Sequence, residues 1–361
     1  MSRWVAAWLM PAAVFQSVIV GGAYGTGREV AEYIARYGPW GGLGVIALAG
    51  AGFGAILAVS FELARVTRCF DYRRFLRALL GRAWIVYELM FVLLLLVVLA
   101  VTGAAAGSIL ADTFGVRRTD GVLIMLGVVV VTTYFGQRIV AITLTAGAVL
   151  LTTMILSVMI IVMLRSGDAI AATFRAAETV PGWARSACVF VLYNSALAPV
   201  LLYVAAPLAS RREALGAGLA AGLAGVLPAF AFHLAFMSAY PDIVSAELPT
   251  YQLIDGLGLP AMRALYVCIL FMTIVQTGVG VLQGVNDRLD NWWREDHTRG
   301  LVPWQRSVVA AAAIVASLWL AEQGIVALVA RGYGTLAWGF LFVYTVPVMT
   351  IGVARILRAT R

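Results

Sequence analysis

Long apolar runs, divided by short segments that carry arginine, are the feature that most limits how this chain can fold. About 20 apolar residues are needed to cross the hydrocarbon core of a bilayer. Ten runs of this kind are predicted, at residues 4–36, 40–65, 82–110, 120–136, 139–164, 183–209, 213–239, 260–286, 304–322 and 334–357. Only 12% of the residues are charged, against about 25% in a soluble domain. The chain is therefore predicted to be an all-α integral membrane protein with no separate soluble domain.

Arginine supplies all 26 basic residues, and it gathers at the ends of the predicted spans. An excess of basic residues marks the cytoplasmic side of a membrane protein. Seventeen of the 26 arginines lie on the cytoplasmic side if the N-terminus is placed there. We therefore expect a multi-pass protein of the bacterial cytoplasmic (inner) membrane with both termini in the cytoplasm. The net charge of +8 then reflects topology and a lipid partner rather than nucleic-acid binding; the oligomeric state stays open.

The first apolar run contains four glycines in seven residues, Gly21, Gly22, Gly25 and Gly27. Glycine weakens a helix, and non-helical backbone survives at membrane depth only where protein buries it or water reaches it. We predict a discontinuous first span. The N–H groups of the restarted helix favour anions, so the break is a candidate site for a carboxylate-bearing solute. Close packing of two helices is the alternative reason for such glycines.

A second interruption is predicted in the sixth span. Pro199 cannot donate a backbone hydrogen bond to Ser195, and Asn194 and Ser195 compete for backbone groups. The two broken spans lie five spans apart. A repeated unit of five spans must run in the opposite direction the second time, which predicts an inverted repeat with units 1–165 and 183–357 in a single transmembrane domain.

Two motifs in these broken spans resemble a known family. The run Gly22-Ala-Tyr-Gly-Thr-Gly-Arg-Glu29 and the pair Tyr193-Asn194 resemble the YkvI-type bacterial membrane proteins. That family is similar to the amino acid–polyamine–organocation transporters, which share the five-plus-five LeuT-type fold. The resemblance implies that the first break receives a substrate carboxylate and that Tyr24 lines the pocket. The candidate substrate-binding residues are Gly22, Ala23, Tyr24, Gly25, Gly27, Tyr193, Asn194 and Ser195.

Four charged residues follow the first break. Arg28, Glu32 and Arg36 are spaced four apart, so they are predicted to pair along one helix face. Four residues before and after Glu29 lie Gly25 and Tyr33, neither of which is basic, so Glu29 lacks such a partner. An intramembrane acid without a local partner is a functional candidate, here for carrying a proton or contacting a substrate amine.

The eighth span offers oxygen atoms for an ion. Thr273 and Thr277 lie on one helical stripe with Gln276 between them. In LeuT-type transporters, hydroxyls of this span help to bind sodium, and hard cations prefer oxygen ligands. The alternative is that both hydroxyls bond back to carbonyls one turn earlier. Sodium and protons, the latter through Glu29, both stay open as coupling ions; no other cofactor is expected.

Other polar features are expected to be structural. Residues 67–82 are predicted to form an amphipathic surface helix that contacts anionic lipid. Buried His233 is expected to be a hydrogen-bonded packing element. Glu62 and Glu88 are expected to pair with arginines of the 65–82 loop.

These observations predict a secondary active transporter of a small organic solute, an amino acid or a related amine or carboxylate. The chain has no Ser/His/Asp set, HExxH motif or Walker loop, so an enzyme is disfavoured. The alternative is a non-transporting membrane sensor or assembly protein that retains the fold.

Overall fold

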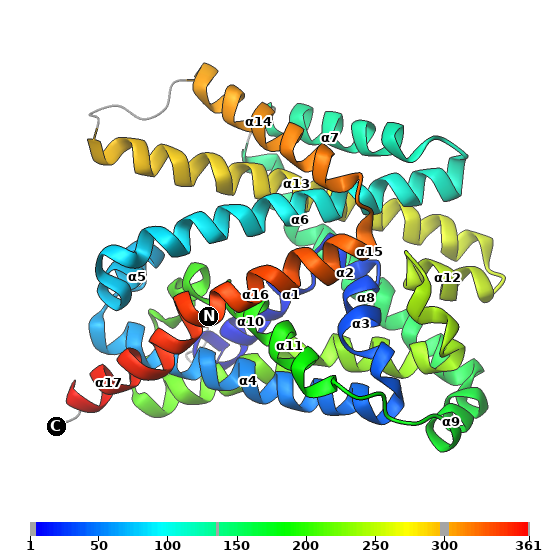
Figure 1. The fold of residues 1–361 in the computed structure, drawn as a ribbon, viewed down its shortest axis with the longest axis horizontal. Helices are drawn as coiled ribbons and strands as arrows, with labels where there is room; N and C mark the ends of the chain where they lie inside the picture. Colours follow the sequence, from blue (N-terminus) through cyan, green and yellow to red (C-terminus); the bar gives the residue numbers. More distant parts are fainter. Residues whose placement is uncertain (1–4, 135–136, 297–302, 360–361) are drawn as a thin grey trace.

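The computed structural model describes residues 5–134, 137–296 and 303–359, which are helical throughout apart from short connections (Figure 1). The first half consists of η1 (Val5–Leu9), α1 (Met10–Ile19), α2 (Gly22–Gly25), α3 (Arg28–Tyr33), η2 (Ala35–Tyr37), α4 (Gly38–Thr67), α5 (Tyr72–Leu80), η3 (Gly81–Ala83), α6 (Trp84–Phe114), α7 (Arg118–Tyr134), α8 (Gln137–Arg165) and α9 (Gly167–Ala176). The second half consists of α10 (Trp183–Ser195), η4 (Ala198–Ala205), α11 (Arg211–Phe236), η5 (Met237–Ala239), η6 (Asp242–Ser245), α12 (Pro249–Gly256), α13 (Pro260–Asp296), α14 (Pro303–Ala321), α15 (Ile325–Ala327), η7 (Leu328–Tyr333), α16 (Gly334–Phe340), η8 (Leu341–Thr345), η9 (Val348–Gly352) and α17 (Val353–Ala359).

Several of these helices are long and apolar enough to cross a membrane. Among the described residues five continuous helices qualify: Arg28–Thr67, Tyr72–Phe114, Arg211–Ala239, Pro260–Asp290 and Ile325–Ala359. Two bent pairs bring the number to seven, α8 with α9 at 77° and α10 with η4 at 61°. The all-helical membrane architecture is thus confirmed. The count of ten spans and the inverted repeat stay predictions.

The helices form two groups that pack mainly within themselves. One group contains α1, α4, α10 and α11. The other contains α6, α7, α13 and α14, with α8 against α13, and it lies along the upper side of Figure 1. The helices α1 and α10, which precede the two breaks, belong to the first group, whereas the turn α2 at the first break packs mainly against α13 and α6. The first break therefore lies where the two groups meet.

The tightest contact in the first group is the crossing of α4 and α11, which glycine makes possible. A Cβ atom on Gly218 would lie 2.2 Å from the backbone nitrogen of Ala58, and one on Gly222 would lie 2.2 Å from the backbone nitrogen of Gly54. The two backbones therefore touch without intervening side chains. Small residues allow such close approach in membranes, where dispersion contacts and not water exclusion hold helices together.

The ends of the molecule carry different short helices. The helices α5 and α17 lie at one end, and α9 and α12 lie at the opposite end (Figure 1). The helix α5 is amphipathic as predicted, but its apolar residues Phe75, Leu76 and Leu79 are buried in the protein. Only its arginine face remains for lipid.

Adding one methyl group at the α4–α11 crossing should test how rigid this group is. Gly218→Ala should lower the unfolding free energy in detergent by about 1–3 kcal/mol, because backbone atoms must move to admit the new Cβ. The matched control is Gly127→Ala in α7, where a Cβ meets nothing within 4 Å. Thermal unfolding of the two purified variants measures the difference. Equal melting temperatures would contradict the close crossing.

Candidate functional site

The first span is interrupted between α1 and α3. The helix α1 ends at Ile19, the single turn α2 follows, and Gly27 then adopts a left-handed conformation with φ of +81°. Residues other than glycine rarely adopt this conformation. A Cβ there would also lie 2.6 Å from side-chain atoms of Phe236 and Thr250. The predicted break is confirmed, and Gly27 is the residue that requires glycine for both reasons.

Groups from other helices satisfy the backbone of this break. The hydroxyl of Tyr266 in α13 donates to the carbonyl oxygen of Gly25 at 3.0 Å. The backbone N–H of Thr250, at the start of α12, donates to the carbonyl oxygen of Thr26 at 3.0 Å. The short helix α12 thus stabilises the break from outside the broken span.

The sixth span breaks where Pro199 predicts. The helix α10 ends at Ser195, and the 3₁₀ helix η4 continues after a bend of 61°. The hydroxyl of Tyr87 in α6 donates to the carbonyl oxygen of Ala196 at 2.6 Å. This bond satisfies a carbonyl at the end of α10 and links the two helix groups.

A cavity of about 90 Å³ lies where the two breaks meet α6 and α13. Its volume holds a few water molecules or a small solute. Its described lining is Val18, Ile19, Gly21, Tyr24 and Glu29 from the first span, Leu94, Leu95 and Val98 from α6, Tyr193, Asn194 and Leu197 from the sixth span, Thr277 from α13, and Tyr333 from η7. Five separate stretches of the chain therefore build one small site.

Glu29 is the only charged residue in that described lining. Its side chain is 6% exposed and accepts a hydrogen bond from the hydroxyl of Tyr193. Tyr193 in turn stacks on Tyr333, with ring centroids 4.7 Å apart and planes at 16°. The acid that lacks a partner on its own helix thus finds a hydroxyl on the other broken span.

The neighbouring charges neutralise one another away from the cavity. Arg28 lies 2.6 Å from a carboxylate oxygen of Glu32 and donates to the carbonyl oxygens of Val244 and Ala246, both at 2.7 Å. Arg36 pairs with the other carboxylate oxygen of Glu32. The predicted pairing along one helix face is confirmed, and it leaves no arginine for Glu29.

The structure brings together only some of the predicted substrate-binding residues. Tyr24, Tyr193 and Asn194 line the cavity with Glu29. Gly25 instead faces Leu151 and Leu270, whose side chains would lie 3.0 Å from an added Cβ. The remaining candidates outside the described lining are Gly27, packed against α11 and α12, Ser195, which is buried beside the break, and Gly22 and Ala23, for which only the backbone of α2 is described.

Of the three candidate ion ligands in α13, only one lies in the described lining of the cavity. Thr277 lines the cavity, and its hydroxyl lies 3.9 Å from the position of a Cβ on Gly21. Thr273 and Gln276 are buried outside the described lining. The hydroxyls of Thr273 and Thr277 donate to the carbonyl oxygens of Ile269 and Thr273, at 2.8 and 2.9 Å. A hydroxyl that donates in this way keeps lone pairs for a cation.

Sequence reasoning missed the contribution of α6 and of Tyr333. Leu94, Leu95 and Val98 lie in a continuous apolar run with no period that marks a cavity-lining face. Tyr333 lies between Gly332 and Gly334, and this spacing alone does not indicate a site.

His233 and the two acids near the α5 end serve packing and pairing. The ring of His233 is fully buried and hydrogen-bonds the carbonyl oxygen of Pro39 at 2.9 Å, as expected. Glu62 pairs with Arg65 as predicted, at 2.7 Å. Glu88 is paired by Arg288 of α13 at 3.0 Å, a partner that the sequence did not indicate, and its predicted pairing with an arginine of the 65–82 loop stays a prediction.

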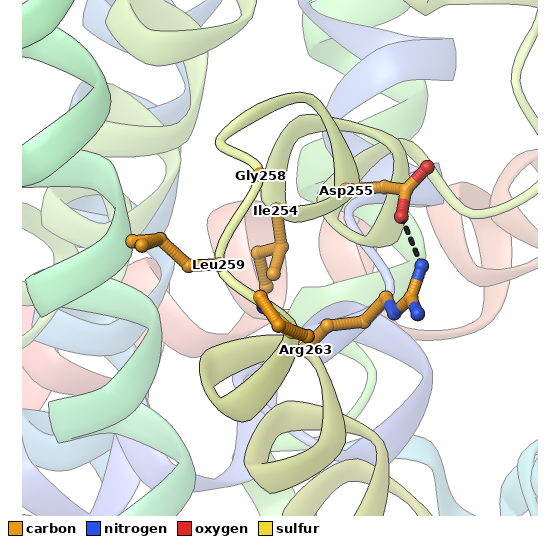
Figure 2. A pocket seen from close by; sticks show the side chains of 6 residues that line it. Ile254, Asp255, Gly258, Leu259 and Arg263 are labelled. Carbon is orange, nitrogen blue, oxygen red and sulfur yellow. Dashed lines mark hydrogen bonds and ion pairs between the residues drawn. The ribbon is translucent and has the colours of Figure 1, made fainter.

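A second pocket, of about 150 Å³, lies at the surface between α12 and α13 (Figure 2). It also contains an acid, Asp255, but the guanidinium of Arg263 pairs with it, as the dashed line in Figure 2 marks. Both side chains are about half exposed. This pocket therefore lacks the buried, unneutralised charge that distinguishes the cavity at the breaks.

Comparison with known proteins identifies the fold. No protein-family model and no curated protein matches the sequence. The chain is similar to the inward-facing structure of Mhp1, with 17% identity and a TM-score of 0.61 over 94% of this chain and 75% of that one. It is also similar to a substrate-bound, outward-open Na⁺-coupled sialic acid symporter, with 14% identity and a TM-score of 0.52 over 96% of this chain and 87% of that one. Both have the LeuT-type fold, which this chain shares; membership of the YkvI-type family stays a prediction.

The bond between Glu29 and Tyr193 should appear as a coupling in stability. In a double-mutant cycle, Tyr193→Phe and Glu29→Ala should couple by about 1.5–3 kcal/mol, the range for a hydrogen bond to a charged group. Thermal unfolding of the single and double variants measures the coupling. Tyr344→Phe, which removes a hydroxyl bonded to Ser60 at 2.7 Å, should be additive with Glu29→Ala. Additivity in both cycles would mean that the Glu29–Tyr193 bond contributes nothing.

Proposed function

We propose that this protein is a secondary active transporter that moves a small organic solute across the bacterial cytoplasmic membrane. The observation that supports this best is the position of the cavity. It lies where both broken spans meet, and it is lined from both helix groups. In transporters with broken helices, substrate and ion sites lie at such points. We propose no catalytic role for the site.

Alternating access would follow from movement of one helix group against the other. A larger open cavity of about 550 Å³, which we call the vestibule, is lined by α3, α10, η7 and α16. Tyr33 lines the vestibule, and its ring centroid lies 5.6 Å from that of Tyr193, which lines the inner cavity. Separation of these rings would join the two spaces. Under the proposed orientation, with both termini in the cytoplasm, the vestibule is on the outer side.

The volume of the cavity limits the size of the proposed solute, and its lining residues limit the choice of coupling ion. The cavity of about 90 Å³ has room for a small solute only, and we propose an amino acid or a related amine or carboxylate. The proposed coupling ion is sodium or a proton. Sodium would be held between Gly21 and Thr277, where the first break faces α13, whereas a proton would be carried by Glu29.

The direct test is counterflow in proteoliposomes. Vesicles that contain the purified protein are loaded with one unlabelled amino acid or amine and are diluted into the labelled compound. Transient accumulation that protein-free vesicles do not show would support transport. A panel in which no compound exchanges would favour the non-transporting sensor or assembly role.

Gly21 offers a way to fill the cavity without disturbing its walls. The nearest atom to an added Cβ is the Thr277 hydroxyl at 3.9 Å, so Gly21→Ala should fold and exchange solute. Gly21→Leu should fold but lose counterflow, because its side chain occupies the space between the first break and α13. The measurement is counterflow by the two variants. A monodisperse elution profile of each purified variant checks that it is folded. Full activity of Gly21→Leu would place the solute elsewhere.

Thr277→Val should reveal sodium coupling. It keeps the side-chain shape and deletes one oxygen, so it should weaken sodium and, through linkage, solute binding by roughly 1–3 kcal/mol. The matched control is Thr350→Val, whose hydroxyl also donates one turn back, to Val346 at 2.6 Å. Solute binding titrated against sodium should shift in Thr277→Val only. An unchanged sodium dependence would exclude this hydroxyl as a ligand and favour protons.

A further inference from the structure

We infer that the cavity at the two breaks selects an organic cation, an amine whose ammonium group is held by the carboxylate of Glu29 beside the rings of Tyr24, Tyr193 and Tyr333. This inference names the solute class for the proposed transport site. It rests on that function for its biological meaning, but binding tests it independently of transport.

The charges around the cavity favour a cation. Glu29 is 6% exposed, and none of the described residues in the lining is basic. The adjacent Arg28 is committed to Glu32 and to two carbonyl oxygens. A buried carboxylate without a cationic partner is costly, and a bound ammonium group would offset that cost.

The dipoles of α1 and α10 act in the same direction, whereas Glu29 itself lies in the first turn of the short helix α3. The helix α1 contributes Val18 and Ile19 from its last turn, and α10 contributes Tyr193 and Asn194 from its last turn. The C-terminal end of a helix carries partial negative charge, which stabilises cations nearby. Two helices of ten and thirteen residues therefore direct their negative ends toward the cavity that contains Glu29.

Three backbone donors at the first break already have acceptors within the chain. The backbone N–H groups of Gly25 and Gly27 donate to the carbonyl oxygens of Gly21 and Tyr24, at 3.1 and 2.9 Å. The N–H of Arg28 donates to the hydroxyl of Thr26 at 3.2 Å. An anionic solute would have to displace these bonds while lying close to Glu29. The break therefore favours an ammonium group over a carboxylate.

The aromatic lining suits an organic ammonium group better than a metal ion. Rings of tyrosine attract cations through their quadrupoles, most strongly where water is excluded. Three tyrosines line a cavity that holds more than a single ion. Tyr24 is 1% exposed, and its hydroxyl has no hydrogen-bond partner within the described part of the chain. A bound amine or a polar group on its carbon chain can supply that partner.

The test compares two solutes that share an apolar chain and differ in charge. Purified protein is titrated with 3-methylbutylamine, with 4-methylpentanoate and with sodium chloride alone, in a potassium buffer. Calorimetry and thermal shift report binding. We expect the amine to bind and stabilise the protein and the carboxylate not to. Tighter binding of 4-methylpentanoate, or binding of neither solute at millimolar concentration, overturns the inference.

Variants then identify the group that holds the ammonium. Glu29→Gln keeps the side-chain shape and should weaken the amine by about 10- to 100-fold, as expected for loss of a charge-assisted bond. The matched control, Asp255→Asn, neutralises the acid of the surface pocket in Figure 2 and should leave the affinity unchanged. Tyr333→Leu keeps the carboxylate and should weaken the amine several-fold, which provides a test if Glu29→Gln does not fold. The inference is refuted if Glu29→Gln binds the amine with unchanged affinity. It is also refuted if sodium chloride alone raises the melting temperature of the wild-type protein and Glu29→Gln abolishes that effect.

Counterflow separates this inference from the proposed function. Amine binding that depends on Glu29, without counterflow of the amine, would retain the cation site and reject transport. Counterflow of 4-methylpentanoate that Gly21→Leu abolishes would retain transport and reject the amine.

Discussion

The fold depends on one constraint, namely that backbone polar groups freed by a helix break inside a membrane must find partners within the protein. Each break recruits them from a distant helix. Tyr266 of α13 bonds Gly25, and Tyr87 of α6 bonds Ala196. Both donors come from the second helix group, and the acceptors lie at the breaks that follow α1 and α10 of the first group. The bonds that make the breaks tolerable are therefore also bonds across the interface where the cavity lies.

Two acids three residues apart show how the chain separates structure from function. Glu32 receives Arg28 and Arg36, so its charge is neutralised on its own helix. Glu29 lines the cavity at the breaks and receives a hydrogen bond from the hydroxyl of Tyr193. Both carboxylates are mostly buried. At Glu32 the two arginines offset the free-energy cost of burying the carboxylate. At Glu29 no arginine of the described pairs does so, and under our inference a bound cation would offset that cost.

The sequence predicts those features that short-range physics controls. The glycine cluster and Pro199 locate both breaks, and four-residue spacing identifies the Arg28–Glu32–Arg36 pairing, because these signals act within a turn or two of helix. The partner of Glu29 lies 164 residues away, and the partner of Glu88 lies 200 residues away. Such pairs are decided by how helices cross. The same limit hides the contribution of α6, whose apolar residues look alike whether they face lipid, another helix or a cavity.

The α4–α11 crossing and the interface at the cavity differ in how much movement their packing permits. Within the first group, α4 and α11 meet backbone to backbone at Gly218 and Gly222, so sliding one helix past the other would force atoms to overlap. At the cavity, the first group meets Leu94, Leu95 and Val98 of α6 through side chains around a space. Side chains of this kind can change rotamer as helices shift by small amounts. Under the proposed transport cycle, this packing favours movement of α4 and α11 as one body and movement of the two groups relative to each other at the cavity interface.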